Sequence, residues 1–166
     1  MDILKAIKIR RSVRDFKQKA IPRKAIETLI EAARFAPTAR NVQPWEFIII
    51  TDASMLEKIG GLAENGRFIA KSACCIALYC AETKYYLEDG SAATQNILLA
   101  AAAEGIASCW VAGDKKPYCS QISALLGAPA SFKLVSLIAL GYPQNKKSFY
   151  AALKRSRKEM MHWEKF

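Results

Sequence analysis

Three arginines and a serine crowd into five residues near the start of the chain: Arg10, Arg11, Ser12 and Arg14. Because a guanidinium group offers paired donors that match the oxygens of a phosphate, this cluster predicts an anion site. A second basic run, Lys154–Lys158, lies near the other end of the chain. One phosphate held from both chain ends would explain both clusters. A nucleic-acid backbone would explain them too, and each cluster could also be a solvated basic turn.

A loop bounded by Pro37 and Pro44 carries three short polar side chains, Thr38, Asn41 and Gln43. Amide side chains combine donors with acceptors, which is what the edge of a flat heterocycle requires. The alternative is an ordinary capped loop that leads into a strand.

The residues that are missing exclude several kinds of catalytic site. His162 is the only histidine, so neither a histidine-based triad nor a multi-histidine metal site is expected. The five cysteines are odd in number and match no metal-binding spacing, so we expect reduced core residues. No phosphate-binding Gly-x-x-x-x-Gly-Lys-Ser/Thr motif is present. An enzyme made from this chain would need a cofactor to carry its chemistry.

Length and composition set the broad class. With 166 residues, 52% of them hydrophobic and 24% charged, the chain predicts one globular domain spanning residues 1–166. The formal net charge of +10 suits either a polyanion or a phosphorylated cofactor. We see no targeting segment and no apolar run of roughly 18 residues, and therefore expect a cytoplasmic protein without a membrane partner.

The elements that must position these side chains alternate along the chain. Helices are expected at 2–9 with Asp2 as N-cap, from Pro22 to about 35, from 52 to near the Gly60-Gly61 pair, at 90–104, at 117–126 and in the tail 149–166. Strands are expected at 46–51, 73–81, 107–111 and 134–140. Strand 73–81 is apolar throughout and should be central. The pattern predicts an α+β fold with helices covering a sheet. A Rossmann fold is disfavoured because the first strand follows two helices and no Gly-x-Gly-x-x-Gly motif is present.

Five segments, in order, resemble the FMN-dependent nitroreductase family. They are Arg10-Arg11-Ser12-x-Arg14-x-Phe16, Ala36-Pro37-Thr38-Ala39-x-Asn41-x-Gln43-Pro44-Trp45, the helix 92–101 with the following Gly105-Ile106-Ala107-Ser108-Cys109-Trp110, Gly141-Tyr142-Pro143, and the ending at 157–164. The resemblance implies a nitroreductase-like α+β fold. Its central, mostly antiparallel sheet of four to five strands would be flanked by helices, in an intertwined homodimer with FMN at the subunit interface.

The resemblance also implies roles for individual residues. Arg10, Arg11 and Ser12 would bind the FMN phosphate and ribityl chain, Arg14 would lie near the pyrimidine edge, and Arg155 and Arg157 would complete the phosphate site. The other subunit would supply Pro37, Thr38, Ala39, Asn41 and Gln43. The stretch Trp110, Val111, Ala112 and Gly113 would border the flavin, with backbone N–H groups around Ala112 and Gly113 facing its N5 and O4, and Asn65 would contact the ring. The pair Gln95 and Asn96 would sit against the partner subunit.

No protein acid or base is then required as a catalytic residue. Reduced flavin carries negative charge at its pyrimidine end, and a fixed cation such as Arg14 stabilises that charge. The resemblance implies that NADH or NADPH reduces FMN and leaves, and that an electron-poor small molecule, such as a nitroaromatic or quinone, is then reduced in a ping-pong mechanism.

Two alternatives stay open. The segment 82–89 is short where many family members insert helices over the flavin, and Ala112 stands where many carry an acidic residue. Both departures would fit a protein that stores, senses or processes flavin without general reductase turnover. The net charge of +10 would fit a nucleic-acid module, but no nucleic-acid motif is present and we expect no such partner.

Overall fold

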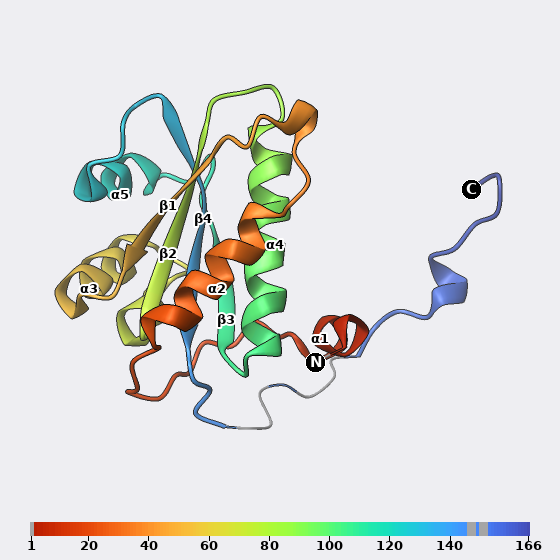
Figure 1. Ribbon diagram of the computed structural model, residues 1–166, viewed down its shortest axis with the longest axis horizontal. Helices are drawn as coiled ribbons and strands as arrows, with labels where there is room; N and C mark the ends of the chain where they lie inside the picture. The colour runs from red at the N-terminus through yellow and green to blue at the C-terminus, as the bar shows by residue number, and fades with distance from the viewer. Residues whose placement is uncertain (1, 146–148, 150–152) are drawn as a thin grey trace.

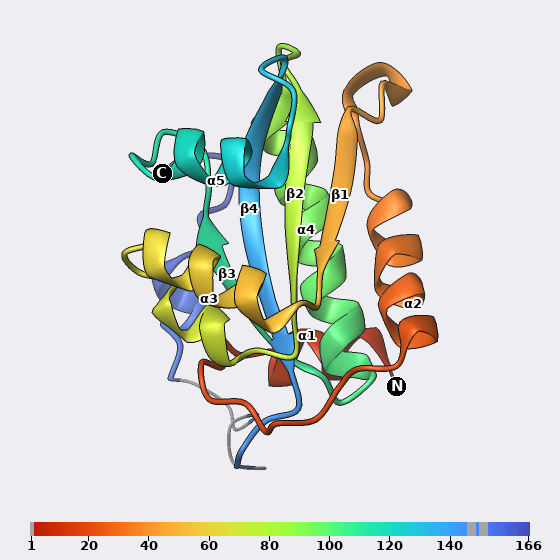
Figure 2. The same ribbon diagram turned by 90° about the vertical axis from the view of Figure 1, so that its left-hand side faces the viewer.

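The computed structural model describes residues 2–145, 149 and 153–166. Within them, four strands form one antiparallel sheet in the order β1-β2-β4-β3 (Figure 2). The strands are β1 (Trp45–Ile50), β2 (Cys74–Ala81), β3 (Ala107–Ala112) and β4 (Phe132–Gly141). This arrangement confirms the expected antiparallel α+β sheet, and it places β1 and β3 at the two edges.

Helices cover both faces of the sheet (Figure 1). The helices α2 (Arg23–Arg34) and α4 (Tyr86–Ala103) pack on one face, and α3 (Ala53–Leu62) and α5 (Cys119–Leu126) on the other. A short α1 (Ile3–Ile9) lies against α4. Three 3-10 turns, at Ala39–Asn41, Arg67–Lys71 and Arg157–Glu159, complete the elements used below. No described helix is both long enough and apolar enough to cross a membrane.

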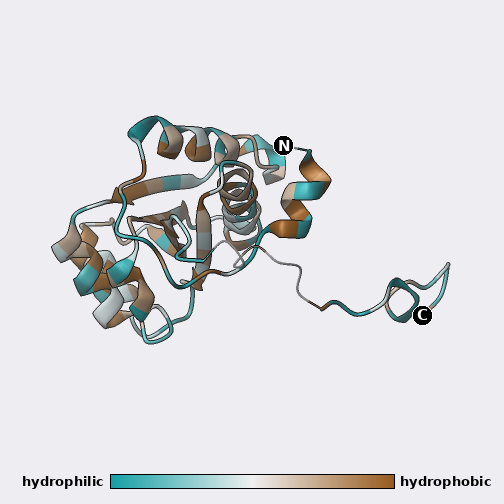
Figure 3. Ribbon diagram, turned by 90° about the horizontal axis from the view of Figure 1, so that it is seen from below, coloured by the Kyte–Doolittle hydropathy of each residue, from teal (hydrophilic) through white to brown (hydrophobic). Residues whose placement is uncertain are grey.

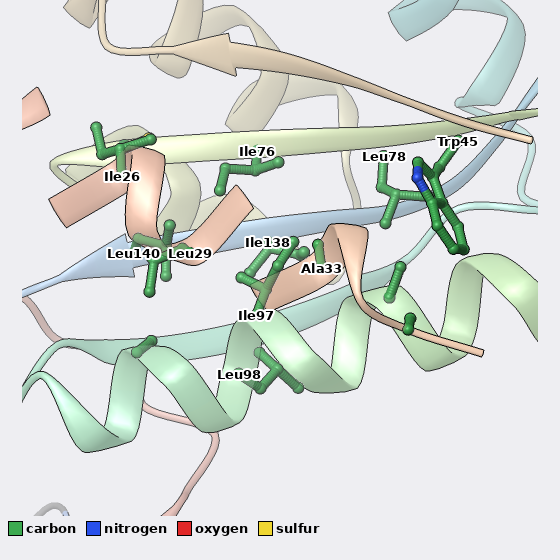
Figure 4. Packing of buried hydrophobic residues seen from close by; sticks show 14 of the residues in the cluster. Ile26, Leu29, Ala33, Trp45, Ile76, Leu78, Ile97, Leu98, Ile138 and Leu140 are labelled. Carbon is green, nitrogen blue, oxygen red and sulfur yellow. The ribbon is translucent and has the colours of Figure 1, made fainter. Parts of the chain in front are cut away.

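Alternation along β2 builds a core on each side of the sheet. Ile76 and Leu78 face α2 and α4, where they meet Leu29 and Ile97 (Figure 4). Ala77, which lies between them, and Tyr79, which follows them, face α3 and α5. Successive side chains of a strand point to opposite faces, so a strand covered on both sides must be apolar throughout. The expectation that this strand is central is confirmed.

Local signals account for most helix ends. A side-chain oxygen of Asp2 accepts a hydrogen bond from the backbone N–H of Lys5 (3.3 Å), as an N-cap does. Asp52 does the same for Met55 at the start of α3 (2.8 Å). The helix α5 ends at Gly127, whose φ of 65° is left-handed and suits glycine.

The helix α3 ends at Leu62, near the Gly60-Gly61 pair as expected, and Gly60 is the point where α3 packs closely on the backbone of Ala70. Two other expectations about helices are wrong. The helix α4 begins at Tyr86, four residues before the expected start. The tail is not a helix: residues 153–166 are an exposed extension with one 3-10 turn, because no described part of the body covers an apolar face for it (Figure 3). Residues 150–152 of the expected tail helix lie outside the described residues.

Candidate functional site

The arginine segment runs along the free edge of β3. The backbone N–H of Val13 donates to the carbonyl of Ser108 (2.9 Å), and Ser12 and Ser108 form a parallel β-bridge. Val13 and Phe16 are buried and anchor the segment, whereas Ser12 and Arg14, on either side of Val13, are exposed. Alternation in an extended segment therefore turns the polar side chains outward.

Two cations of this segment, Arg10 and Arg14, are not paired with a carboxylate of the described residues. Among the described residues, the ion pairs join Arg23 to Glu27, Arg34 to Glu31 and Lys133 to Glu82, so neither Arg10 nor Arg14 takes part in one.

The guanidinium of Arg14 lies over the ring of Phe68, 5.7 Å from its centroid. Burial raises the pKa of the Cys109 thiol in β3. The charges of Arg14 and Arg10 and the hydrogen bond of the Ser12 hydroxyl lower this pKa, but by less than burial raises it. The local field therefore favours an anion, and these residues fit a phosphorylated ligand.

The edge of β3 also presents backbone donors. Gly113 N–H donates to the Val135 carbonyl of β4 (3.0 Å), so by the alternation of an antiparallel ladder the odd-numbered residues of β3 bond to β4. The backbone groups of Ser108, Trp110 and Ala112 consequently point to the free edge, the side on which the arginine segment lies. The exposed Ala112, with its small side chain, leaves room for a flat ring at this edge.

The expected role of Gly113 needs a correction. Its N–H is engaged inside the sheet and does not face a ligand. A Cβ at this position would lie 2.3 Å from the carbonyl oxygen of Leu134, so glycine is required for the close approach of β3 and β4. The side chains of Trp110 and Val111 pack into the two cores, which leaves the backbone of Trp110 and Ala112 as the edge donors.

Asn65 lies close to this edge. It is exposed and precedes Gly66, where a Cβ would lie 3.2 Å from Cγ1 of Val111. Phe68, two residues after Gly66, is the ring under Arg14. The structure thus gathers Arg14, Asn65 and the end of β3 in one place.

The proline-bounded loop is fixed to the first turn of α4. Asp89 accepts hydrogen bonds from the Thr38 hydroxyl (2.9 Å) and from the backbone N–H of Ala39 (3.1 Å). Asn41 and Gln43 are exposed; the Asn41 side chain is available to a ligand, whereas the Gln43 side-chain amide donates to the Asn41 carbonyl (3.4 Å). Sequence reasoning missed Asp89 because the helix was expected to begin one residue later. An acidic residue in a helix's first turn was the signal that could have found it.

The loop and the arginine segment lie at opposite ends of α4 (Figure 1). Asp89 is in the first turn of this helix, whereas Ser108, which holds the arginine segment, follows its last residue by five positions. Eighteen helical residues span about 27 Å. A single chain therefore does not bring the two halves of the expected site together.

The tail arginines are also apart from the first cluster within one chain. Arg155 and Arg157 lie on the extension that leaves the body, where Arg155 donates to the Glu159 carbonyl (2.9 Å) (Figures 1 and 3). Of the pair expected against a partner, Gln95 is exposed, but the Asn96 amide donates to the Ala32 carbonyl of α2 (2.9 Å). Asn96 thus joins two helices of its own chain.

Comparison with known proteins gives a consistent family. The model of the nitroreductase family matches residues 7–73 and 81–142. A protein of Archaeoglobus fulgidus, provisionally named NADH dehydrogenase/NAD(P)H nitroreductase, is 36% identical over 99% of this chain and 99% of its own.

Solved structures agree with that match. A Parabacteroides distasonis protein with the same provisional name superposes with a TM-score of 0.92 at 28% identity, covering 99% of this chain and 98% of its own. A provisionally assigned nitroreductase from Desulfovibrio desulfuricans, solved in complex with FMN, has a TM-score of 0.82 at 26% identity and covers 100% and 98% of the two chains. The antiparallel sheet, the arginine segment on its edge and these matches together show that the chain belongs to the nitroreductase family.

Proposed function

We propose that this nitroreductase-family oxidoreductase works as a homodimer with one FMN between each arginine segment and the partner's proline-bounded loop. NADH or NADPH reduces the flavin and departs, and an electron-poor acceptor such as a nitroaromatic or quinone then takes the electrons in a ping-pong cycle. The observation that carries the proposal is the separation of the two half-sites along α4.

In a two-fold symmetric dimer, the arginine segment of one chain could lie close to the proline-bounded loop of the other. If α4 packs antiparallel on its own copy, the loop at the start of one α4 comes beside the arginine segment at the end of the other. Apolar side chains at both ends of the helix support such a contact. Exposed hydrophobic residues of this kind mark an interface, and here they are Ile3, Leu4 and Ile7 of α1, Phe35 after α2 and Val42 in the loop.

The residues of each half-site suit different parts of FMN. Arg10, Arg11 and Ser12 would hold the phosphate, and Arg14 would fix a positive charge beside the pyrimidine edge. The N–H of Ala112 at the free edge of β3 would face the N5 and O4 region. FMN supplies the hydride chemistry when bound, which fits a chain whose only histidine lies on the exposed tail.

The partner loop would complete the ring pocket with Pro37, Thr38, Ala39, Asn41 and Gln43, opposite Asn65. The tail would cover the second copy. Such a contact would bury the exposed apolar residues of the tail, which are Leu153, Met160, Met161, Trp163 and Phe166. Arg155 and Arg157 would then reach the phosphate site of the second copy.

An FMN titration followed by anaerobic reduction tests the proposal. Purified protein should take up one FMN per chain, lose its flavin absorbance with NADH or NADPH, and recover it when a nitroaromatic or quinone is added. Initial rates at several acceptor concentrations should give parallel double-reciprocal lines. Protein that cannot bind FMN would contradict the proposal.

A flavin-binding protein without turnover is the second candidate. The connection between β2 and α4 has only four residues, 82–85, so it carries no additional helix that could cover the proposed flavin site. Steady-state assays with both nicotinamides separate the two functions, because rapid multiple turnover is incompatible with a storage or sensing role.

A further inference from the structure

We propose that Asp89 is a positioning residue, whose buried carboxylate holds the loop 37–43 in the conformation that serves the FMN site of the partner subunit. This inference rests on the proposed function, and it adds a residue that the sequence motifs do not contain.

Asp89 is a charged group that is only 5% exposed. Such a carboxylate requires hydrogen-bond donors, and both its oxygens have one: Oδ2 accepts from the Thr38 hydroxyl and Oδ1 from the Ala39 N–H. Asp89 also acts on the core, because its charge adds to burial in raising the pKa of the Cys80 thiol to about 12. The carboxylate therefore faces inward and ties the loop to the body.

The loop that it holds is strained. Arg40, Asn41 and Gln43 have φ values of 54°, 56° and 51°, in the left-handed region that residues other than glycine rarely adopt. Three such residues within four positions persist only where the surroundings fix them. Here the outside anchors are the two bonds to Asp89.

A chain of hydrogen bonds connects Asp89 through Thr38 to Gln43 and Asn41. The Thr38 hydroxyl donates to Asp89 and accepts from the backbone N–H of Gln43 (3.2 Å). The Gln43 side-chain amide in turn donates to the Asn41 carbonyl (3.4 Å). Loss of the carboxylate would release Thr38 and then the strained turn behind it.

A general helix-capping role does not explain Asp89. A carboxylate in the first turn interacts favourably with the helix dipole, but the exposed Glu88 in the same turn supplies that charge and makes no hydrogen bond to the described loop residues. Burial and the bonds to Thr38 and Ala39 distinguish Asp89 from its neighbour. Glu88→Gln is accordingly the matched control.

The first experiment compares FMN affinity with the stability of the apoprotein. Asp89→Asn and Thr38→Val should each weaken FMN binding by roughly tenfold or more, because each disrupts a part-buried hydrogen bond that holds the loop. Glu88→Gln should bind FMN like the wild type, and Thr38→Ser, which keeps the hydroxyl that donates to Asp89, should bind FMN more tightly than Thr38→Val. If Asp89→Asn does not fold, Thr38→Val and Thr38→Ser decide the question. Unchanged FMN affinity in a folded Thr38→Val protein would overturn the inference.

The second experiment asks in which subunit Asp89 acts. A mixed dimer is formed from one Asp89→Asn chain and one chain with both Arg10→Ala and Arg14→Ala, and it is titrated with FMN. One site combines both defects, whereas the other has intact arginines from one chain and an intact loop from its partner. We expect one site of wild-type affinity per mixed dimer, although either homodimer has none.

The mixed dimer separates failure of this inference from failure of the proposed function. If no site of wild-type affinity appears, the carboxylate serves the site of its own chain and the inference is wrong. Wild-type protein that binds no FMN would instead contradict the proposed function.

Discussion

Arg14 is the residue on which cofactor chemistry depends most in this account. Its guanidinium lies over Phe68, and among the described residues it takes part in no ion pair. Two neighbouring cations in the same segment make this stretch attractive to a phosphate, whereas Arg14 alone is expected beside the ring. Its loss should therefore change both the affinity for FMN and the electron affinity of the bound flavin.

Replacing Arg14 by glutamine is the direct test. FMN should bind about tenfold or more weakly, because a charge-assisted bond is lost, and the midpoint potential of bound FMN should become more negative. Both are measurable by fluorescence titration and by spectroelectrochemistry. Arg23→Gln is the control, since Arg23 lies on the surface of α2, where it pairs with Glu27. An unchanged potential in Arg14→Gln would contradict the assigned role.

The buried thiols predict a fall of stability at alkaline pH. Burial raises the pKa of Cys74 and of Cys80 from 9.0 to about 12, and it raises the pKa of Cys75 as well. The unfolded chain loses these protons first, so stability is complete below about pH 9 and is lost as the pH rises toward 12. The free energy of unfolding from urea titrations should decrease across this window. In Cys80→Ala the free energy of unfolding should decrease less steeply with pH. The same slope as in the wild type would show that the Cys80 thiol does not cause the decrease.

At the scale of elements, sequence signals were reliable where the cause is local. The caps at Asp2 and Asp52 and the left-handed Gly127 depend on neighbouring residues, so they could be read from the chain. The start of α4 could not be read in this way, because Asp89 in its first turn accepts a hydrogen bond from Thr38, which is 51 residues away in the sequence. The position of Asn96 against Ala32 likewise depends on how two helices pack.

Two glycines provide a matched test of the sheet edge. Gly113→Ala should destabilise the protein by about 1–3 kcal/mol, since its Cβ would collide with the Leu134 carbonyl, and should weaken FMN binding by shifting the edge of β3. Gly61→Ala has open space around its Cβ within α3 and should stabilise by about 0.5–1 kcal/mol. Thermal unfolding measures both. Equal effects of the two substitutions would contradict the close approach at Gly113.

At the scale of the whole molecule, the order of elements and the antiparallel sheet were predictable, because apolar periodicity and five ordered segments specify them. The site was predictable only as separate pieces. Neither the placement of the loop and arginine segment at opposite ends of α4 nor the departure of the tail from the body follows from local sequence. Both depend on tertiary packing.

Removal of residues 153–166 tests the proposed role of the tail. All of these residues are exposed in one chain, so their deletion should leave the circular dichroism of the sheet and helices largely intact. If they cover a second copy, deletion should shift the monomer–dimer equilibrium toward monomer and weaken FMN binding, as sedimentation velocity and FMN titration would reveal. A truncated protein with unchanged dimerisation and affinity would refute the role.

The most direct measurement is native mass spectrometry of the full chain mixed with excess FMN. Two half-sites that meet only between subunits predict a dimer that carries two FMN molecules and a monomer that carries none. Dilution toward monomer should release the cofactor in parallel with dissociation. Tight FMN on an isolated monomer, or a stable dimer without FMN capacity, would contradict the account.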